Sequence, residues 1–277
     1  MDTGWLASLE LGFEARGERS VMSRRRHEGP LRVQRSFHPE GAPCHSYLIH
    51  PPGGVVGGDR LEVNISVASG AHALVTTPAA GKFYRSAGPW ARQNQRFRVA
   101  DDASLEWLPA LNILHGGARV RMHNRFDLES GARLLAWDLL GLGRPGSGDH
   151  FDTGACDAGL QVWQGDHPLL DERLRLDGGS PTLTAPWGMG GQGYLATLVA
   201  WPATPAMLDA LREAMHARPG PKPGCTLLGA ESGDGLLVCR WLAPAGEALW
   251  EALVASWSVL RPLVMERPAC PPRIWST

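Results

Sequence analysis

The sequence has no apolar run near the roughly 18 residues that a membrane-spanning helix needs. Residues 1–10 lack the basic and apolar segments of a secretory signal. The 27 Lys and Arg against 28 Asp and Glu give a net charge of -1, so charge offers no reason to expect nucleic acid or a membrane as partner. The cysteines are scattered and form no CxxC pair: Cys44, Cys156, Cys225, Cys239 and Cys270. With neither a disulfide framework nor a zinc ribbon indicated, we predict a cytoplasmic protein.

Signatures of catalysis are also missing. Gly81–Phe83 begins like a phosphate-binding loop but has Phe where that loop has Ser or Thr. Gly188–Gly193 matches GxGxxG, yet a strand is predicted after it, whereas the dinucleotide fingerprint needs a helix there. No GxSxG elbow occurs. Four potential metal ligands cluster without zinc-site spacing: His38, Cys44, His45 and His50. We predict no catalytic residue and no enzymatic activity.

Glycine and proline, by contrast, are abundant, with 34 and 22 copies, as is typical of many short strands joined by tight turns. Apolar and polar residues alternate with a period of two over residues 5–15, 61–67 and 118–128, so each segment has one buried and one wet face. This pattern predicts a mainly β protein of antiparallel or stacked sheets, β-helix-like or sandwich-like. No linker divides the chain, and we expect a single domain over residues 1–277.

Two α-helices are expected in the C-terminal half. Thr204 is a suitable N-cap and Pro205 a suitable first residue for a helix over about 204–217. A second apolar stripe predicts a helix over about 246–261, with Pro262 ending it.

The segment His50–Asp59 is the most unusual of the chain. Its four glycines permit close backbone approach, so it is either a turn between strands or a surface for a ligand or partner. Glu106 and Asp138 stand beside tryptophans on predicted strands, and alternation places each acid opposite its tryptophan. Each acid is then either solvated on an outer face or held in an enclosed polar space, where it would be functional.

Five segments, in order along the chain, together resemble the landmarks of the UreD (also called UreH) family of urease accessory proteins: residues 50–59, 76–86, 105–109, 142–151 and 271–277. The resemblance implies a β-rich fold of stacked sheets with a helical pair. It also implies a scaffold that binds apo-urease and the accessory protein UreF, which recruits the GTPase UreG. Nickel would pass through this assembly to urease, so the resemblance implies transient Ni²⁺ contact and no tightly bound cofactor.

On this resemblance, the candidates for the partner surface or the nickel route are His50, Gly57, Gly58, Asp59, Lys82, Tyr84, Glu106, Asp138, Arg144 and Asp149. The candidates for direct metal contact are Asp59, Glu106, His115 and Asp138, since carboxylate and imidazole both ligate Ni²⁺. Trp90, Trp187 and Trp275 are either interface anchors or core residues.

The sequence departs from the family pattern at Ala110–His115, where an acid is lost and a histidine gained. Two alternatives therefore stay open beside the nickel scaffold. One is an interaction module without nickel handling. The other is a β-rich, metal-dependent hydrolase centred on His50 and Asp59.

Overall fold

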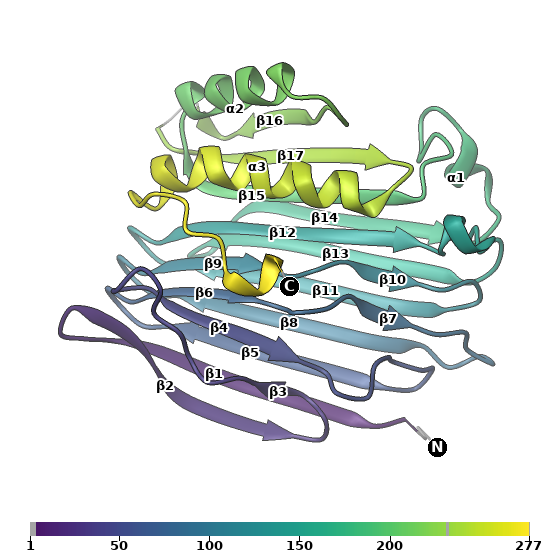
Figure 1. Ribbon diagram of the computed structural model, residues 1–277, viewed down its shortest axis with the longest axis horizontal. Helices are drawn as coiled ribbons and strands as arrows, with labels where there is room; N and C mark the ends of the chain where they lie inside the picture. Colours follow the sequence, from purple (N-terminus) through teal and green to yellow (C-terminus); the bar gives the residue numbers. More distant parts are fainter. Residues whose placement is uncertain (1–3, 231–232, 277) are drawn as a thin grey trace.

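A computed structural model describes residues 4–230 and 233–276, which form two stacked β-sheets with a helical layer on one of them. Figure 1 shows the chain advancing steadily along the stack, from β1 and β2 at one end to β16 and α2 at the other. The mainly β fold, with its sheets in a solenoid-like stack, confirms the predicted fold class. Thr277, the last residue of the C-terminal landmark, lies outside the described residues.

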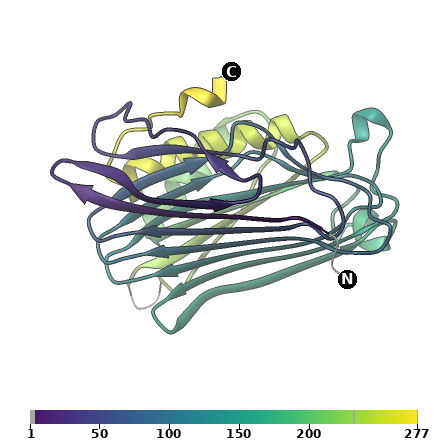
Figure 2. The ribbon, with the colours of Figure 1, turned by 90° about the horizontal axis from the view of Figure 1, so that it is seen from below.

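The first sheet has seven strands and an outer face that no helix covers (Figure 2). In spatial order its strands are β14 (His167–Asp177), β13 (Ala155–Gln164), β11 (Arg119–Leu128), β8 (Ala91–Val99), β5 (Arg60–Val67), β1 (Leu6–Arg16) and β2 (Arg19–Glu28).

The second sheet has ten strands. Eight form one path: β16 (Gly224–Leu228), β17 (Gly235–Ala243), β15 (Tyr194–Ala203), β12 (Arg133–Leu142), β9 (Ser104–Leu108), β6 (His72–Thr76), β4 (Cys44–Ile49) and β3 (Arg32–Val33). Two short strands lie off this path, where β10 (Asn112–Leu114) pairs with both β12 and β7 (Gly81–Phe83).

Both sheets are mixed, with parallel pairs among β1, β5, β8, β11 and β13 and among β4, β6, β9 and β12, so the predicted antiparallel pairing holds for only part of each sheet. The chain passes from one sheet to the other and back, so β5, β8, β11 and β13 become parallel neighbours. Antiparallel pairs join β1 with β2 and β13 with β14 at the two edges of the seven-stranded sheet, and they join β12, β15, β17 and β16 successively in the ten-stranded sheet. Alternation reports that a strand is half-buried but says nothing of its direction, which depends on whether a connection returns within a sheet or crosses to the other one.

Two apolar clusters fill the layers. The larger lies between the sheets and takes the inward residues of the alternating strands, such as Leu9 of β1 and Phe97 of β8. The second lies between the ten-stranded sheet and the helices, where Trp137 and Leu139 of β12 meet Leu253 and Trp257. The ten-stranded sheet is therefore covered on both faces, and its side chains point either between the sheets or toward the helices.

The helices are α1 (Pro181–Thr184), α2 (Pro205–Ala217) and α3 (Gly246–Val264), with 3-10 turns at Pro145–Ser147 and Arg273–Ser276. Thr204 caps α2 as predicted, its Oγ1 accepting from the Met207 N–H at 3.4 Å. The predicted end of α3 is wrong: Pro262 lies inside the last turn. A proline there removes only one backbone hydrogen bond near the end of the helix, and buried Leu260, Arg261 and Val264 hold the turn in place. No helix in the described ranges is long and apolar enough to span a bilayer.

The C-terminal 3-10 turn is fixed by tryptophan packing. Trp275 lies 5.2–5.6 Å, centroid to centroid, from Trp137, Trp250 and Trp257, and its indole N–H donates to Thr76 Oγ1 at 3.0 Å. Trp275 thus belongs to the packed layer over the ten-stranded sheet, whereas Trp187 is 75% exposed.

Replacing Trp275 by alanine is expected to lower the free energy of unfolding by about 2 kcal/mol. The figure lies below that for a fully buried tryptophan because Trp275 is only half-buried. Urea denaturation would measure it. Trp187→Ala is the matched control and should change stability by about 0.5 kcal/mol or less, since that side chain is largely in solvent. Equal losses in the two variants would contradict this assignment.

Candidate functional site

The glycine-rich segment is ordered by one carboxylate. Asp59 Oδ1 accepts the backbone N–H of Trp5 at 2.9 Å, and Oδ2 accepts that of Val56 at 3.0 Å. Burial lowers the pKa of nearby His50, and the charge of Asp59 partly opposes this. Both Asp59 oxygens are therefore engaged in shaping the loop and in holding the N-terminal strand against it.

The glycines of this segment allow close packing. A Cβ at Gly57 would lie 2.2 Å from Ser86 Oγ, and Gly58 has a φ of +98°. A Cβ at Gly54 would lie 2.1 Å from the ring of Tyr84. These are positions where a side chain cannot be accommodated without displacing the neighbour.

Tyr84 connects the glycine-rich segment with a second group of predicted residues. Its ring stacks on His115 at 5.2 Å, and His115 Nδ1 lies 3.4 Å from Asp149 Oδ2. Partial burial raises the pKa of Asp149, but hydrogen bonds from the N–H groups of Gly116 and Phe151 outweigh it and hold the pKa below its usual range. The histidine gained in the Ala110–His115 segment thus meets a carboxylate, although not one from its own strand.

Lys82 and Arg144 complete this end of the stack. The Lys82 carbonyl accepts the Val55 N–H at 2.8 Å, and the Arg144 N–H donates to the Asp149 carbonyl at 2.8 Å. Both side chains are exposed. The structure therefore gathers nine of the predicted residues in one surface region at the ends of β4, β7, β10 and β12: His50, Gly57, Gly58, Asp59, Lys82, Tyr84, His115, Arg144 and Asp149.

Glu106 lies elsewhere, and the expectation of a solvated outer face for it is wrong. Its side chain is 0% exposed and points from β9 toward α3. It contacts His72 Nε2 at 2.8 Å and accepts from the Trp257 indole N–H at 2.6 Å and from Arg261 Nε at 3.0 Å. Burial raises the pKa of Glu106, but these partners more than offset it, so the pKa lies below its usual value. Contacts with these three side chains tie Glu106 to both the sheet and the helix.

Arg261 extends this group to Glu40. Its two terminal nitrogens donate to the Glu40 carboxylate at 2.6 and 2.9 Å, and the Pro268 carbonyl also accepts from it. Burial raises the pKa of Glu40, yet hydrogen bonds from His45, at 2.7 Å, and from Arg261 bring it down to about 2. We call Glu40, His45, His72, Glu106, Trp257 and Arg261 the buried ion cluster.

Asp138 points to the other side of the ten-stranded sheet, into the space between the sheets. Its Oδ2 accepts from Asn124 Nδ2 of β11 at 2.5 Å. Burial raises its pKa to about 7, and the hydrogen bond from Asn124 offsets this only in part. Of the two acids singled out beside tryptophans, Asp138 is therefore the enclosed one that forms no ion pair with another described residue.

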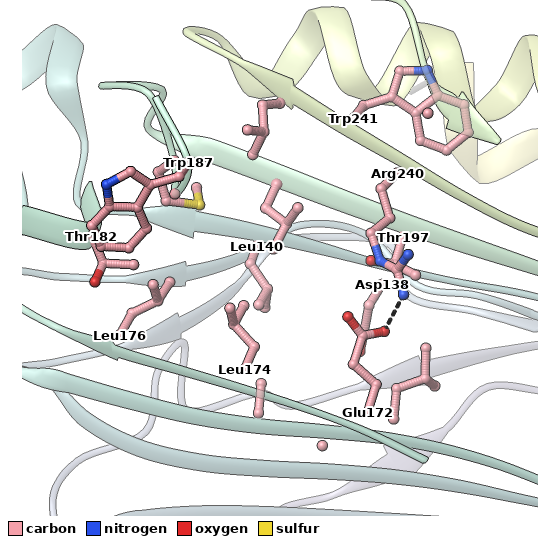
Figure 3. A pocket seen from close by; sticks show the side chains of 18 of the residues that line it. Asp138, Leu140, Glu172, Leu174, Leu176, Thr182, Trp187, Thr197, Arg240 and Trp241 are labelled. Carbon is pink, nitrogen blue, oxygen red and sulfur yellow. Dashed lines mark hydrogen bonds and ion pairs between the residues drawn. The ribbon is translucent and has the colours of Figure 1, made fainter. Parts of the chain in front are cut away.

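Asp138 lines a cavity of about 610 Å³ between the sheets (Figure 3). Glu172 and Arg240 lie at the same end and form an ion pair of 2.6 Å, while Trp187 and Thr182 lie at the opposite end. Two buried polar atoms in and near this space, Arg240 Nε and Asn124 Oδ1, have no protein partner. Such atoms indicate a site for water or an ion.

Asn124, Glu172 and Arg240 were missed by sequence reasoning. The sequence pattern could have identified two of them, because Asn124 and Glu172 stand at inward-facing positions of strands whose other inward-facing residues are largely apolar. Arg240 is likewise the only charge in the apolar strand β17. The four candidates for direct metal contact do not meet one another: Asp59, Glu106, His115 and Asp138. No group of three or more His, Cys, Asp or Glu able to hold a metal occurs in residues 4–230 and 233–276.

Comparison with known proteins covers nearly the whole chain. The family model described as UreD urease accessory protein matches residues 6–276. The chain is 53% identical over 274 residues to "Urease accessory protein UreD" of Alkalilimnicola ehrlichii, covering 99% of this chain and 92% of that protein. It is 50% identical to a protein of the same name from Pseudomonas putida, covering 100% and 96%, and 45% identical to one from Citrobacter koseri, covering 99% and 92%. The chain therefore belongs to the UreD family of urease accessory proteins.

Proposed function

We propose that this chain is a cytoplasmic, non-catalytic assembly factor that binds apo-urease and UreF, with UreG held through UreF, and gives Ni²⁺ a polar path toward urease during GTP-dependent insertion. The observation that carries the nickel path is Asp138, a carboxylate without a fixed cation that lines a cavity between two sheets. Family membership supports the assembly role.

The chemistry of the cavity suits passage of a metal ion better than its storage. Asp138 and Glu172 offer carboxylate oxygens to a divalent cation. Arg240, paired with Glu172 at 2.6 Å, competes for one of them. The remaining lining is largely apolar, including Leu140, Leu174 and Leu176. One free carboxylate and one occupied carboxylate make a weak, incomplete site, which binds an ion transiently and releases it.

Nothing in the described geometry favours the hydrolase alternative. His50 and Asp59 lie near each other, but both Asp59 oxygens accept backbone N–H groups. A metal-dependent hydrolase also needs further ligands beside this pair, and no group of three or more His, Cys, Asp or Glu able to hold a metal occurs in the part of the chain that the structure describes. The glycine-rich segment therefore fits the shaping of a partner surface, together with exposed Lys82 and half-exposed Tyr84.

Co-expression of the urease subunits with UreF and UreG, with and without this chain, tests the proposal. With the chain present, we expect urease with high nickel content and urea hydrolysis; without it, both should fall severalfold or more. Equal nickel content and activity would reject the proposed function. If urease gains this chain as a partner but no nickel, the chain is an interaction module without nickel handling.

A further inference from the structure

The open face of the seven-stranded sheet carries a concentration of arginine. On β8, the outward residues include Arg92, Arg96 and Arg98, all exposed. On the neighbouring strand β11, Arg119, Arg121 and Arg125 point the same way, and β14 adds Arg173 and Arg175. We call these eight residues the arginine face. Because the whole chain has a net charge of -1, this positive charge is a local feature of the face.

Several of these arginines oppose one another. The parallel register of β8 and β11 places Arg92 beside Arg121 and Arg96 beside Arg125. Like charges directly opposite on neighbouring strands destabilise a sheet. Among the described residues, Arg92, Arg96 and Arg98 have no carboxylate within ion-pair distance. The isolated chain thus carries an electrostatic cost that an acidic partner would relieve.

Two tryptophans hold part of this face rigid. The guanidinium groups of Arg119 and Arg121 lie 4.9 and 4.6 Å from the ring centroid of Trp90, one of the predicted interface anchors. Arg125 lies 4.7 Å from the ring of Trp163. Stacking restricts the long side chains before any partner binds, which lowers the entropy lost on binding. Trp and Arg are also the residues that most often dominate binding energy at protein interfaces.

We propose that the arginine face is the docking surface for an acidic face of apo-urease; this rests on the proposed function, in which apo-urease is a partner. The arginine face covers four adjacent strands, β8, β11, β13 and β14, of a seven-stranded sheet whose whole outer face, with strands about 4.8 Å apart and about ten residues long, is about 900 Å². A standard protein interface takes roughly 800 Å² from each partner, so the partner would cover the arginine face together with the neighbouring strands β5, β1 and β2.

A protein partner fits this surface better than a nucleic acid. The arginines are interrupted by carboxylates on the same face, including Asp127, which accepts from Arg125 at 2.7 Å, and Asp157, which accepts from Arg173 at 2.6 and 2.7 Å. Acids within the footprint repel a phosphate backbone, whereas a protein surface can match a pattern of both signs. The sheet also offers a broad face instead of a groove that follows a strand of phosphates.

The test uses the tagged full chain, co-expressed with the urease subunits and UreF, and compares it with the double variant Arg92→Glu/Arg96→Glu. Both side chains are exposed, and glutamate at either position would face Arg121 or Arg125, so the variant should fold at least as well as the parent. We expect urease affinity to fall about tenfold or more while UreF binding is unchanged. Arg92→Gln/Arg96→Gln should give an intermediate loss. Raising the salt concentration should weaken the parent complex.

Arg212→Glu/Arg218→Glu is the matched control, because it makes the same change in net charge on the side of α2 and should leave urease binding unaltered. If the parent binds urease and Arg92→Glu/Arg96→Glu binds it equally, the docking surface is wrong while the proposed function stands. If the parent itself fails to bind urease, the proposed function fails and the inference with it. If the variant loses only co-purifying nucleic acid, measured by absorbance before and after nuclease, the face belongs to nucleic acid and the inference is overturned.

Discussion

Arg261→Ala is expected to lower the free energy of unfolding by about 3–5 kcal/mol. The side chain is 0% exposed and holds Glu40 and Glu106 together between the sheet and α3. Removing the guanidinium leaves two buried carboxylates without their cation, and the penalty for an unpaired buried charge exceeds the value of the pair itself. Chemical denaturation at neutral pH measures the loss directly.

The matched control is Arg133→Ala. Arg133 also links the ten-stranded sheet to the end of α3, through Glu266 at 2.9 Å and the Val264 carbonyl at 3.0 Å, but this pair lies in solvent. Exposed ion pairs contribute little, so the control should lose far less stability. A loss in Arg261→Ala no greater than in Arg133→Ala would contradict the buried ion cluster as a main link between the layers.

The same cluster sets a pH dependence. The folded-state pKa of Glu40, about 2, lies below its ordinary value of 4.5. A carboxyl group whose pKa is lower in the folded than in the unfolded protein stabilises the fold. This stabilisation is complete above the unfolded-state pKa and is lost as the pH falls toward the folded-state pKa. The parent should therefore lose stability between about pH 4.5 and about pH 2. In Arg261→Ala this loss should shrink, because Glu40 then has no arginine to favour its charged form.

The period-two pattern predicted most of the sheet architecture, since Leu9, Leu11 and Phe13 face the core as their spacing requires. It did not predict parallel pairing, because the direction of a strand depends on where each turn leads. For Glu106, alternation correctly placed the acid opposite Trp107. It could not show that α3, more than a hundred residues later in sequence, covers that face and supplies Trp257 and Arg261.

The candidate site was likewise predicted from the sequence only in part. Landmark segments supplied Tyr84 and Asp149, and the departure from the family pattern supplied His115; these residues meet at one end of the stack because short loops at one edge of a sheet lie together. The cavity depends on the distance between two sheets and on which inward positions are polar. Glu172 and Arg240 are 68 residues apart on strands of different sheets, and only the stacking of the two sheets brings them into contact.

Asp138→Asn is expected to stabilise the protein by about 2–4 kcal/mol at about pH 8. Because the folded-state pKa of Asp138, about 7, lies above its ordinary value of 3.8, the carboxyl ionises more easily in the unfolded chain. Stability of the parent therefore falls as the pH rises from about 4 to about 7, and asparagine removes this penalty. Its amide can also donate to Asn124 Oδ1, which has no partner in the parent. Urea denaturation of both proteins across this pH range should show the gain fading in acid.

The same substitution should lower the nickel content of co-expressed urease, because the cavity loses the one carboxylate without a fixed cation. A proton and Ni²⁺ compete for that oxygen, so in the parent nickel transfer should fall as the pH drops below about 7. Thr197→Val, which changes another lining residue without removing a charge, is the control and should transfer nickel normally. A variant that is more stable yet delivers less nickel would show that Asp138 is kept at a cost to folding. One that is more stable and delivers nickel as well as the parent would exclude Asp138 from the path.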